Sequence, residues 1–268
     1  MIDARRVRIS DAVSKLVVGA VLALGAALLL VPAAVVVLLS FSDDRFLSFP
    51  PRSWGLRQYD ALMSQTAWHD AVVLSLQLAA VTAVASILLA VPTALVLARS
   101  RLRGRFAIEG LGLIALVLPI SAYAVAMYAV FAQLRLLGSF AGLVIADLVI
   151  SFPLTFLVVS SALGQVPREL ELAAMTMGAG RVRAWLGVTL RLVLPAIVAG
   201  GLLAFITAFD EAVFINFLGG PDLVTLPKAI FDSVRYEVDP VITAIATVVM
   251  AVTTVLMVVS ASLRKGLR

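Results

Sequence analysis

The sequence predicts an all-α membrane protein with six transmembrane helices, and three observations support this prediction. Hydrophobic residues make up 62% of the 268 residues and charged residues only 14%, whereas soluble domains average about 45–50% and about 25%. The apolar residues come in long blocks. Lys and Arg gather in segments that would all lie on one side of a six-helix topology.

Six blocks approach the length of a membrane span, which is roughly 20 residues at about 1.5 Å of rise per residue. They cover residues 15–41, 72–98, 107–132, 140–163, 193–218 and 240–262. Helices are expected, because lipid cannot satisfy the unpaired backbone groups of an open strand. The first block lacks a small-residue cleavage site before a soluble domain, so it is expected to remain as a membrane helix. Residues 1–268 are thus expected to form a single transmembrane domain.

The positions of Lys and Arg set the expected orientation, because these residues favour cytoplasmic loops and acids contribute little. Most of the 21 Lys and Arg residues fall in four segments on the same side of the six-helix topology, namely Arg5, Arg6, Arg8, Lys15, Arg99, Arg101, Arg103, Arg105, Arg168, Arg181, Arg183, Arg191, Arg264, Lys265 and Arg268. Both termini are therefore predicted to be cytoplasmic. The basic composition reflects this topology, and nucleic-acid binding is not expected.

The residue types exclude several kinds of chemistry. The chain has no cysteine, so disulfides and thiolate sites are ruled out. His69 is the only histidine, which removes most histidine-based metal and acid–base sites. We expect no metal, no cofactor and no catalytic residue in this chain.

Two external segments are expected. Residues 42–71 are rich in aromatic residues such as Phe46, Trp54 and Trp68, which suits an anchor at the membrane surface; docking of an external partner is the alternative. Residues 219–239 are too irregular in sequence for one continuous helix. They could form a re-entrant turn that lines a pathway, or a simple loop.

Residues 164–192 cannot form a seventh span. They carry six charged side chains, each of which costs roughly 2.5–3.5 kcal/mol or more at a bilayer centre. The segment predicts two short cytoplasmic helices. Pro167 suits a first helical turn, Glu169 and Glu171 would meet the positive end of the helix dipole, and Gly178 supplies a stop.

An apolar stripe runs along the first of these helices. Leu170, Ala173, Ala174 and Met177 recur at helical spacing. The two alanines would let another protein approach the backbone closely. The stripe therefore indicates a protruding helix that fits a cleft in a soluble partner protein. The alternative is a loop folded against its own helix bundle.

The same residues resemble the coupling-loop signature of type I ABC importer permeases, which reads Glu-Ala-Ala, three residues, Gly, nine residues and Ile-x-Leu-Pro. Ala173, Ala174 and Gly178 match at the right spacing, and Val188-Thr189-Leu190 follows at the expected distance. Leu172 stands where the motif has glutamate, with Glu171 adjacent. Arg191 stands where the motif has proline.

A second resemblance is to the spermidine/putrescine branch of these permeases, and specifically to its second permease subunit. It covers nearly the whole chain. Its motifs are Ser40-Phe41-Ser42, Leu102-Arg103-Gly104-Arg105, Ala208-Phe209-Asp210-Glu211-Ala212-Val213, Gly219-Gly220-Pro221, Thr225-Leu226-Pro227 and Phe231-Asp232-Ser233-Val234-Arg235.

The resemblance implies a type I ABC importer permease fold in the bacterial cytoplasmic (inner) membrane. Its expected partners are an ABC ATPase dimer, a second related permease, an external substrate-binding protein and membrane lipid. ATP and Mg²⁺ would be used by the ATPase, since this chain has no G-x-x-x-x-G-K-[ST] sequence. The residues implied to couple to the ATPase are Glu171, Ala173, Ala174 and Gly178.

Three acids could meet a cationic cargo. Asp147 falls within the fourth apolar block, where an ionisable group is a functional candidate by default. Asp210 and Glu211 lie toward the outer end of the fifth block, within the branch resemblance. Carboxylates would stabilise the ammonium groups of a polyamine. The alternatives are a hydrogen bond to a partner permease or backbone for Asp147, and helix-end solvation for the other two.

The predicted function is that of a permease subunit of an ATP-driven importer for polyamines such as spermidine and putrescine, or similar small organic cations. One alternative keeps the architecture and changes the solute to an opine, an amino-phosphonate or another nitrogenous compound. A different-class alternative is a stand-alone secondary transporter or channel. The chain is not expected to be an enzyme.

Overall fold

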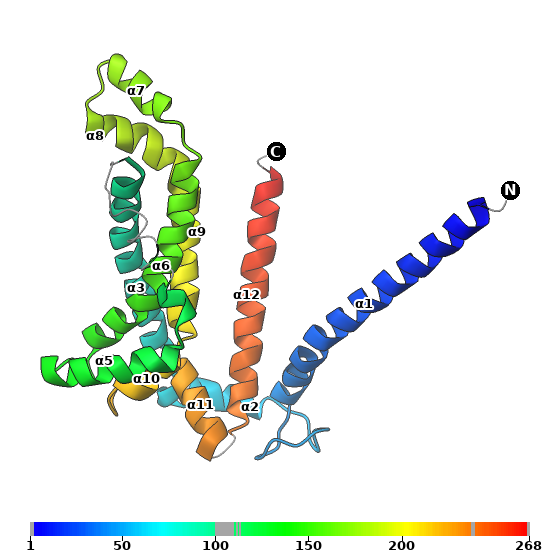
Figure 1. Cartoon of the computed structure of the whole chain (residues 1–268). Coiled ribbons are helices and arrows are strands. Elements are labelled where there is room, and N and C mark those ends of the chain that lie inside the picture. Colours follow the sequence, from blue (N-terminus) through cyan, green and yellow to red (C-terminus); the bar gives the residue numbers. More distant parts are fainter. Residues whose placement is uncertain (1–2, 100–109, 111, 113, 237–238, 267–268) are drawn as a thin grey trace. The chain divides into compact units, whose positions relative to one another are not determined.

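The computed structural model describes residues 3–99, 110, 112, 114–236 and 239–266. Within these ranges every regular element is a helix, as predicted, and the β-type pairing is one isolated bridge between Ser42 and Trp54 (Figure 1). The chain divides into two compact units. One contains residues 1–66 and 233–268, and the other contains residues 67–232.

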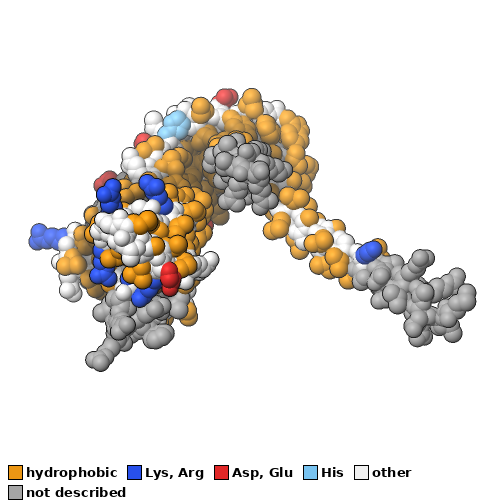
Figure 2. All heavy atoms as spheres, turned by 90° about the horizontal axis from the view of Figure 1, so that it is seen from above, with side chains coloured by type: hydrophobic (Ala, Val, Ile, Leu, Met, Phe, Trp, Pro, Cys, Tyr) orange, Lys and Arg blue, Asp and Glu red, His pale blue; other side chains and the backbone are white. Residues whose placement is uncertain are grey.

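The first unit is built on α1 (Asp3–Ser40), α2 (Arg57–Ser64) and α12 (Val241–Gly266), with α12 in contact with both other helices. Large apolar side chains of α1 are exposed at intervals that cover every side of the helix, for example Leu22, Leu29 and Leu30. Figure 2 shows hydrophobic side chains along its described length. A helix that is apolar all round is suited to lipid contact.

A hydrogen-bonded loop joins α1 to α2. The carboxylate of Asp44 accepts hydrogen bonds from the Arg52 backbone amide at 2.8 Å, the Ser53 hydroxyl at 2.7 Å and the Ser48 hydroxyl at 3.0 Å. These bonds, led by that of the Arg52 amide, lower the pKa of Asp44 to about 2. The buried Gln58 side chain donates to the carbonyls of Ser42 and Asp44, so the loop is anchored on α2.

The second unit contains most of the remaining helices. They are α3 (Thr66–Arg99), α5 (Ile120–Leu134), α6 (Phe140–Gly164), α7 (Arg168–Thr176), α8 (Arg181–Ala184), the π-helical turn η1 (Trp185–Thr189), α9 (Leu190–Phe209) and α10 (Val213–Leu218). The amphipathic α11 (Leu226–Tyr236) begins here and ends in the first unit.

Two apolar clusters form the core of this unit. The first joins α3, α6 and α9 through residues such as Leu97, Val159 and Val193. The second joins α3, α5, α6 and α10 through residues such as Leu78 and Phe214. Both clusters include α3 and α6, so these two helices run through the core of the unit.

A polar contact holds α3, α6 and α9 close together. The Ser86 hydroxyl donates to Thr155 Oγ1 at 2.7 Å, and the Thr155 hydroxyl lies 3.1 Å from the Gly200 carbonyl. A Cβ atom at Gly200 would lie 3.1 Å from Thr155 Cγ2 and 3.3 Å from its Cα. Glycine thus permits the close approach of α6 and α9 at this point.

The predicted spans are found in part. Among the described residues, four helices are long and apolar enough to cross a membrane, over Lys15–Ser40, Thr66–Arg99, Phe140–Gly164 and Arg181–Phe209, with shorter apolar helices at Ile120–Leu134 and Val241–Val255. The predicted span 107–132 falls partly outside the described residues.

The second and fifth predicted spans have different boundaries in the structure, and the fifth, predicted over 193–218, lies in a helical segment that runs over Arg181–Phe209. The second span begins at Thr66 instead of residue 72, because Trp68 and Ala71 lie on one face of α3 and are buried. The predicted span 193–218 is broken after Phe209. A new helix starts at Val213, where Glu211 accepts hydrogen bonds from the backbone amides of Val213 at 2.6 Å and Phe214 at 2.8 Å.

The close approach at Gly200 predicts a destabilising substitution. We expect Gly200→Leu to lower the unfolding free energy by about 1–3 kcal/mol, because the new side chain would force α6 and α9 apart. Gly25→Leu is the matched control, since a Cβ atom at Gly25 meets nothing within 4 Å. Thermal unfolding in detergent would measure both variants, and equal melting temperatures would contradict the packing argument.

The Asp44 loop predicts an acid-dependent opening. Because the pKa of Asp44 is lowered by folding, the loop should be fully stabilised above the ordinary aspartate value and lose that stabilisation as the pH falls through about 2. Trp54 fluorescence in a variant with Trp68→Phe and Trp185→Phe would follow the opening. Asp44→Asn should shift the emission already at neutral pH, whereas Asp60→Asn should not.

Candidate functional site

The α7–α8 segment follows α6 after a short turn. Pro167 occupies the position before α7 with φ −61° and ψ 136°. A proline suits this position, because the first backbone amides of a helix have no partner within the helix. Glu169 and Glu171 lie in the first turn of α7, where the helix dipole favours negative charge.

Gly178 ends α7, as the sequence predicted. Its φ of +92° lies in the left-handed region, which a residue with a side chain adopts only with strain. The Ala179 amide donates to the Ala174 carbonyl and the Gly178 amide to the Met175 carbonyl, both at 3.0 Å. This pair of bonds is a Schellman motif, and it turns the chain sharply toward α8.

The surface of α7 is open. None of its residues is buried, and Leu172 is 58% exposed. Beyond its end, Met177 is 82% exposed. Ala173 is exposed and Ala174 is half-buried, so the predicted stripe is divided between an outward and an inward face. In Figure 2, which looks onto this end of the unit, basic side chains gather among the apolar ones.

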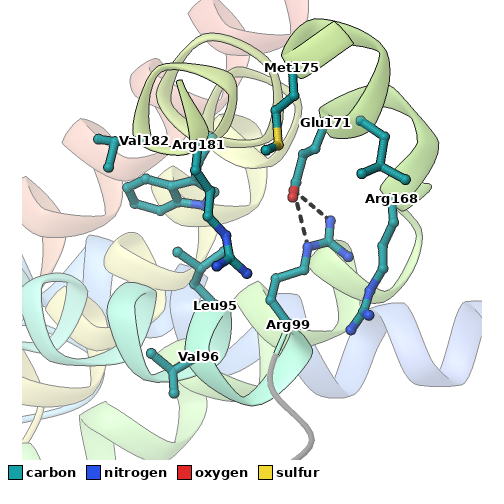
Figure 3. Close-up of a pocket in the computed structure, with 10 residues that line it drawn as sticks. Leu95, Val96, Arg99, Arg168, Glu171, Met175, Arg181 and Val182 are labelled. Carbon is teal, nitrogen blue, oxygen red and sulfur yellow. Dashed lines mark hydrogen bonds and ion pairs between the residues drawn. The ribbon is translucent and has the colours of Figure 1, made fainter. Parts of the chain in front are cut away.

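Glu171 points inward. Its Oε1 atom lies 2.9 Å from Arg99 Nη2 and accepts a hydrogen bond from Arg99 Nε at 3.1 Å (Figure 3). The Thr189 hydroxyl donates to the same oxygen. The side chains of Arg99 and Glu171 are only 15% and 19% exposed. One carboxylate oxygen thus joins α3, α7 and η1.

A second arginine, Arg168, connects α7 to α3 in the opposite direction. Arg168 at the start of α7 donates from Nη2 to the Ala98 carbonyl at the end of α3, at 2.6 Å. Arg99 Nη2 in turn lies 3.4 Å from the Val166 carbonyl. The two arginines therefore link the same two segments from opposite sides.

A pocket of about 630 Å³ lies between these elements. It is lined by residues of α3, α7, α8 and η1, among them Leu95, Arg99, Met175, Arg181 and Trp185 (Figure 3). The indole nitrogen of Trp185 is buried without a hydrogen-bond partner. Side-chain contacts thus connect α7 to α3 and η1 across this pocket.

Arg99 and Thr189 are the residues of this site that sequence reasoning missed as partners of Glu171. In the sequence, Arg99 contributes to the predicted orientation in the membrane, and Thr189 occupies the variable position of the Ile-x-Leu signature. Their separations from Glu171 are 72 and 18 residues. Two features of the sequence could have indicated these partners: Arg99 lies at the end of a long apolar span, and Thr189 carries a hydroxyl group within the signature.

Of the three candidate pathway acids, Asp210 and Glu211 lie at the break between α9 and α10, and Asp147 lies on α6. Asp147 on α6 is 3% exposed, and its Oδ2 atom has no hydrogen-bond partner. Glu211 is half-buried and caps α10, and Asp210 is exposed at the end of α9. Within the described residues, no group of three or more His, Asp or Glu side chains is placed to hold a metal ion.

Comparison with known proteins gives a consistent result. The model of the family described as "Binding-protein-dependent transport system inner membrane component" matches residues 86–268. The putrescine transport system permease protein PotI of Escherichia coli K12 is 32% identical over 85% of this chain and 83% of its own length. The spermidine/putrescine transport system permease protein PotC of Haemophilus influenzae is 30% identical over 83% and 86%.

Among solved structures, a crystal structure of a bacterial ABC transporter involved in the import of the acidic polysaccharide alginate contains a similar chain. The TM-score is 0.70 at 17% identity, over 96% of this chain and 97% of the other. At that identity the match shows the fold alone, which is the type I ABC permease fold that the sequence predicted. The chain therefore belongs to the family of inner membrane components of binding-protein-dependent transport systems.

Proposed function

We propose that this chain forms half of the translocation pathway of an ATP-driven importer for polyamines or similar small organic cations. Relatives named for putrescine and spermidine transport support the substrate class. The observation that carries the coupling part of the proposal is α7. It ends at a signature glycine and buries none of its residues in its own chain.

In this proposal, the segment 167–180 docks in a groove of a separate ATPase. The exposed Leu172, Ala173 and Met177 supply apolar contact area. Apolar surface of this kind on a polar loop is typical of a protein interface. The ATPase dimer would hydrolyse ATP with Mg²⁺; this chain has no G-x-x-x-x-G-K-[ST] sequence.

We further propose a single permease domain with six spans and both termini in the cytoplasm. The positive-inside distribution of Lys and Arg supports this orientation. A second, related permease would complete the pathway, and an external binding protein would deliver the cargo. The apolar surface of α1 suits contact with lipid.

The proposed cargo contacts are Asp147, Asp210 and Glu211. A carboxylate that is buried without a partner is unfavourable in a membrane protein. An ammonium group that passes Asp147 would supply the missing charge and a hydrogen-bond donor. The exposed Asp210 would meet such a cation first, and Glu211 holds the start of α10 beside it.

The docking proposal predicts that Ala173→Arg abolishes ATP-driven uptake. The new side chain would prevent close approach of the ATPase, and Ala173 is exposed, so insertion and folding should be retained. Co-purification of the ATPase and putrescine uptake in proteoliposomes would measure the effect. Gln65→Arg, an exposed change between α2 and α3, is the control. Normal uptake by Ala173→Arg, or uptake by the chain without any ATPase, would refute coupling through α7.

The cargo proposal predicts that Asp147→Asn lowers putrescine uptake by about tenfold, a value in keeping with one lost charge-assisted hydrogen bond. ATPase association should be unchanged. The melting temperature should stay the same or rise, because a buried unpaired carboxylate is replaced by a neutral amide of the same shape. Asp60→Asn on α2 is the control. Full uptake by Asp147→Asn would remove this residue from the pathway.

A further inference from the structure

We propose that Glu171 is a positioning residue that fastens α7 to the end of α3 inside this chain, and that the ATPase meets an apolar surface at this point of the helix. This inference rests on the proposed function, in which α7 is the docking element. It gives Glu171 a role within this chain and assigns the contact with the ATPase to neighbouring residues of α7.

The first argument is the engagement of the Glu171 carboxylate. Its Oε1 atom receives Arg99 Nε at 3.1 Å, Arg99 Nη2 at 2.9 Å and the Thr189 hydroxyl. Charge-assisted bonds of this kind are the strong ones among side chains. With a side-chain exposure of 19%, Glu171 is turned toward its own bundle. An ATPase residue would have to displace Arg99 to reach this oxygen.

The second argument is that the outward surface of α7 is apolar. The position where the importer signature has glutamate is Leu172, and this side chain is 58% exposed. Met177 and Val182 are exposed nearby, at 82% and 69%. A basic residue in the ATPase groove would find no carboxylate at position 172. The fitting partner surface is therefore an apolar patch opposite Leu172.

The third argument is mechanical. The Arg99–Glu171 ion pair and the bond from Arg168 to the Ala98 carbonyl cross between α3 and α7 in opposite directions. Thr189 stands where η1 passes into α9. A displacement of α7 is thus passed to α3 through two arginines and to α9 through one hydroxyl. Small shifts at such a contact can be amplified, because packed interfaces switch between discrete arrangements instead of deforming continuously.

The test compares Glu171→Gln and Arg99→Gln with the wild type in the complete complex of permeases, ATPase and binding protein. Uptake of putrescine and hydrolysis of ATP are measured together in proteoliposomes. We expect the ATPase to remain bound and to hydrolyse ATP, while uptake per ATP falls about tenfold, as coupling variants do. Hydrogen exchange of the amides of residues 168–176 should accelerate in both variants.

Two further variants complete the design. The exchange of charges, Arg99→Glu with Glu171→Arg, should restore much of the uptake, since the pair is re-formed in reverse. Asp60→Asn removes an exposed carboxylate on α2, outside the docking segment, and should change neither uptake nor exchange. Leu172→Glu should weaken ATPase association, because it places a charge against an apolar patch.

Three results would overturn the inference. Loss of the ATPase from Glu171→Gln would make Glu171 a docking contact, full uptake by Arg99→Gln would make the ion pair irrelevant, and tighter ATPase binding by Leu172→Glu would indicate a basic groove. Failure of the proposed function is distinguished from these, because the wild-type complex would then show no ATPase association and no ATP-driven uptake.

Discussion

Hydrocarbon supplies no hydrogen-bond partner to a backbone or charged group, and the other features of this chain depend on that constraint. The long spans are helices because a helix satisfies its own backbone. Some polar groups inside them pair with one another, as in the contact of Ser86 with Thr155 and of Thr155 with the Gly200 carbonyl, whereas Asp147 Oδ2 has no partner. Charged side chains concentrate at the ends of spans and in loops. The proposed coupling contacts lie in such a polar segment, between α6 and α9.

Within that segment, local chemistry was enough to predict α7. The signals are Pro167 before the helix, acids in its first turn and Gly178 after its end. Each acts over only a few residues, so its effect can be recognised from the sequence. The family resemblance rested on the same residues. The second short helix was less predictable: α8 continues through η1 into α9 without a break, since no glycine stop or proline at position 191 interrupts it.

Long-range partners were beyond sequence reasoning. Nothing local to Glu171 indicates that it meets Arg99, which lies 72 residues earlier. That contact depends on how α3 and α6 pack, and packing is set by many apolar side chains that sequence patterns treat as equivalent. The break after Phe209 was missed for a related reason. Apolar residues continue on both sides of the Asp210-Glu211 pair, and only the capping bonds to Val213 and Phe214 show that a new helix begins.

α6 gives the proposed mechanism a physical route. Asp147 lies in its first half, and its last residue, Gly164, is followed by the short turn into α7. At about 1.5 Å per residue, the helix spans about 25 Å between these points. Its tight contact with α9 at Gly200 resists separation of the two helices. A push on α7 would therefore move α6 and α9 together. The carboxyl group of Asp147 lies on α6 and would move with this body, to which α3 is joined through Ser86 and Thr155.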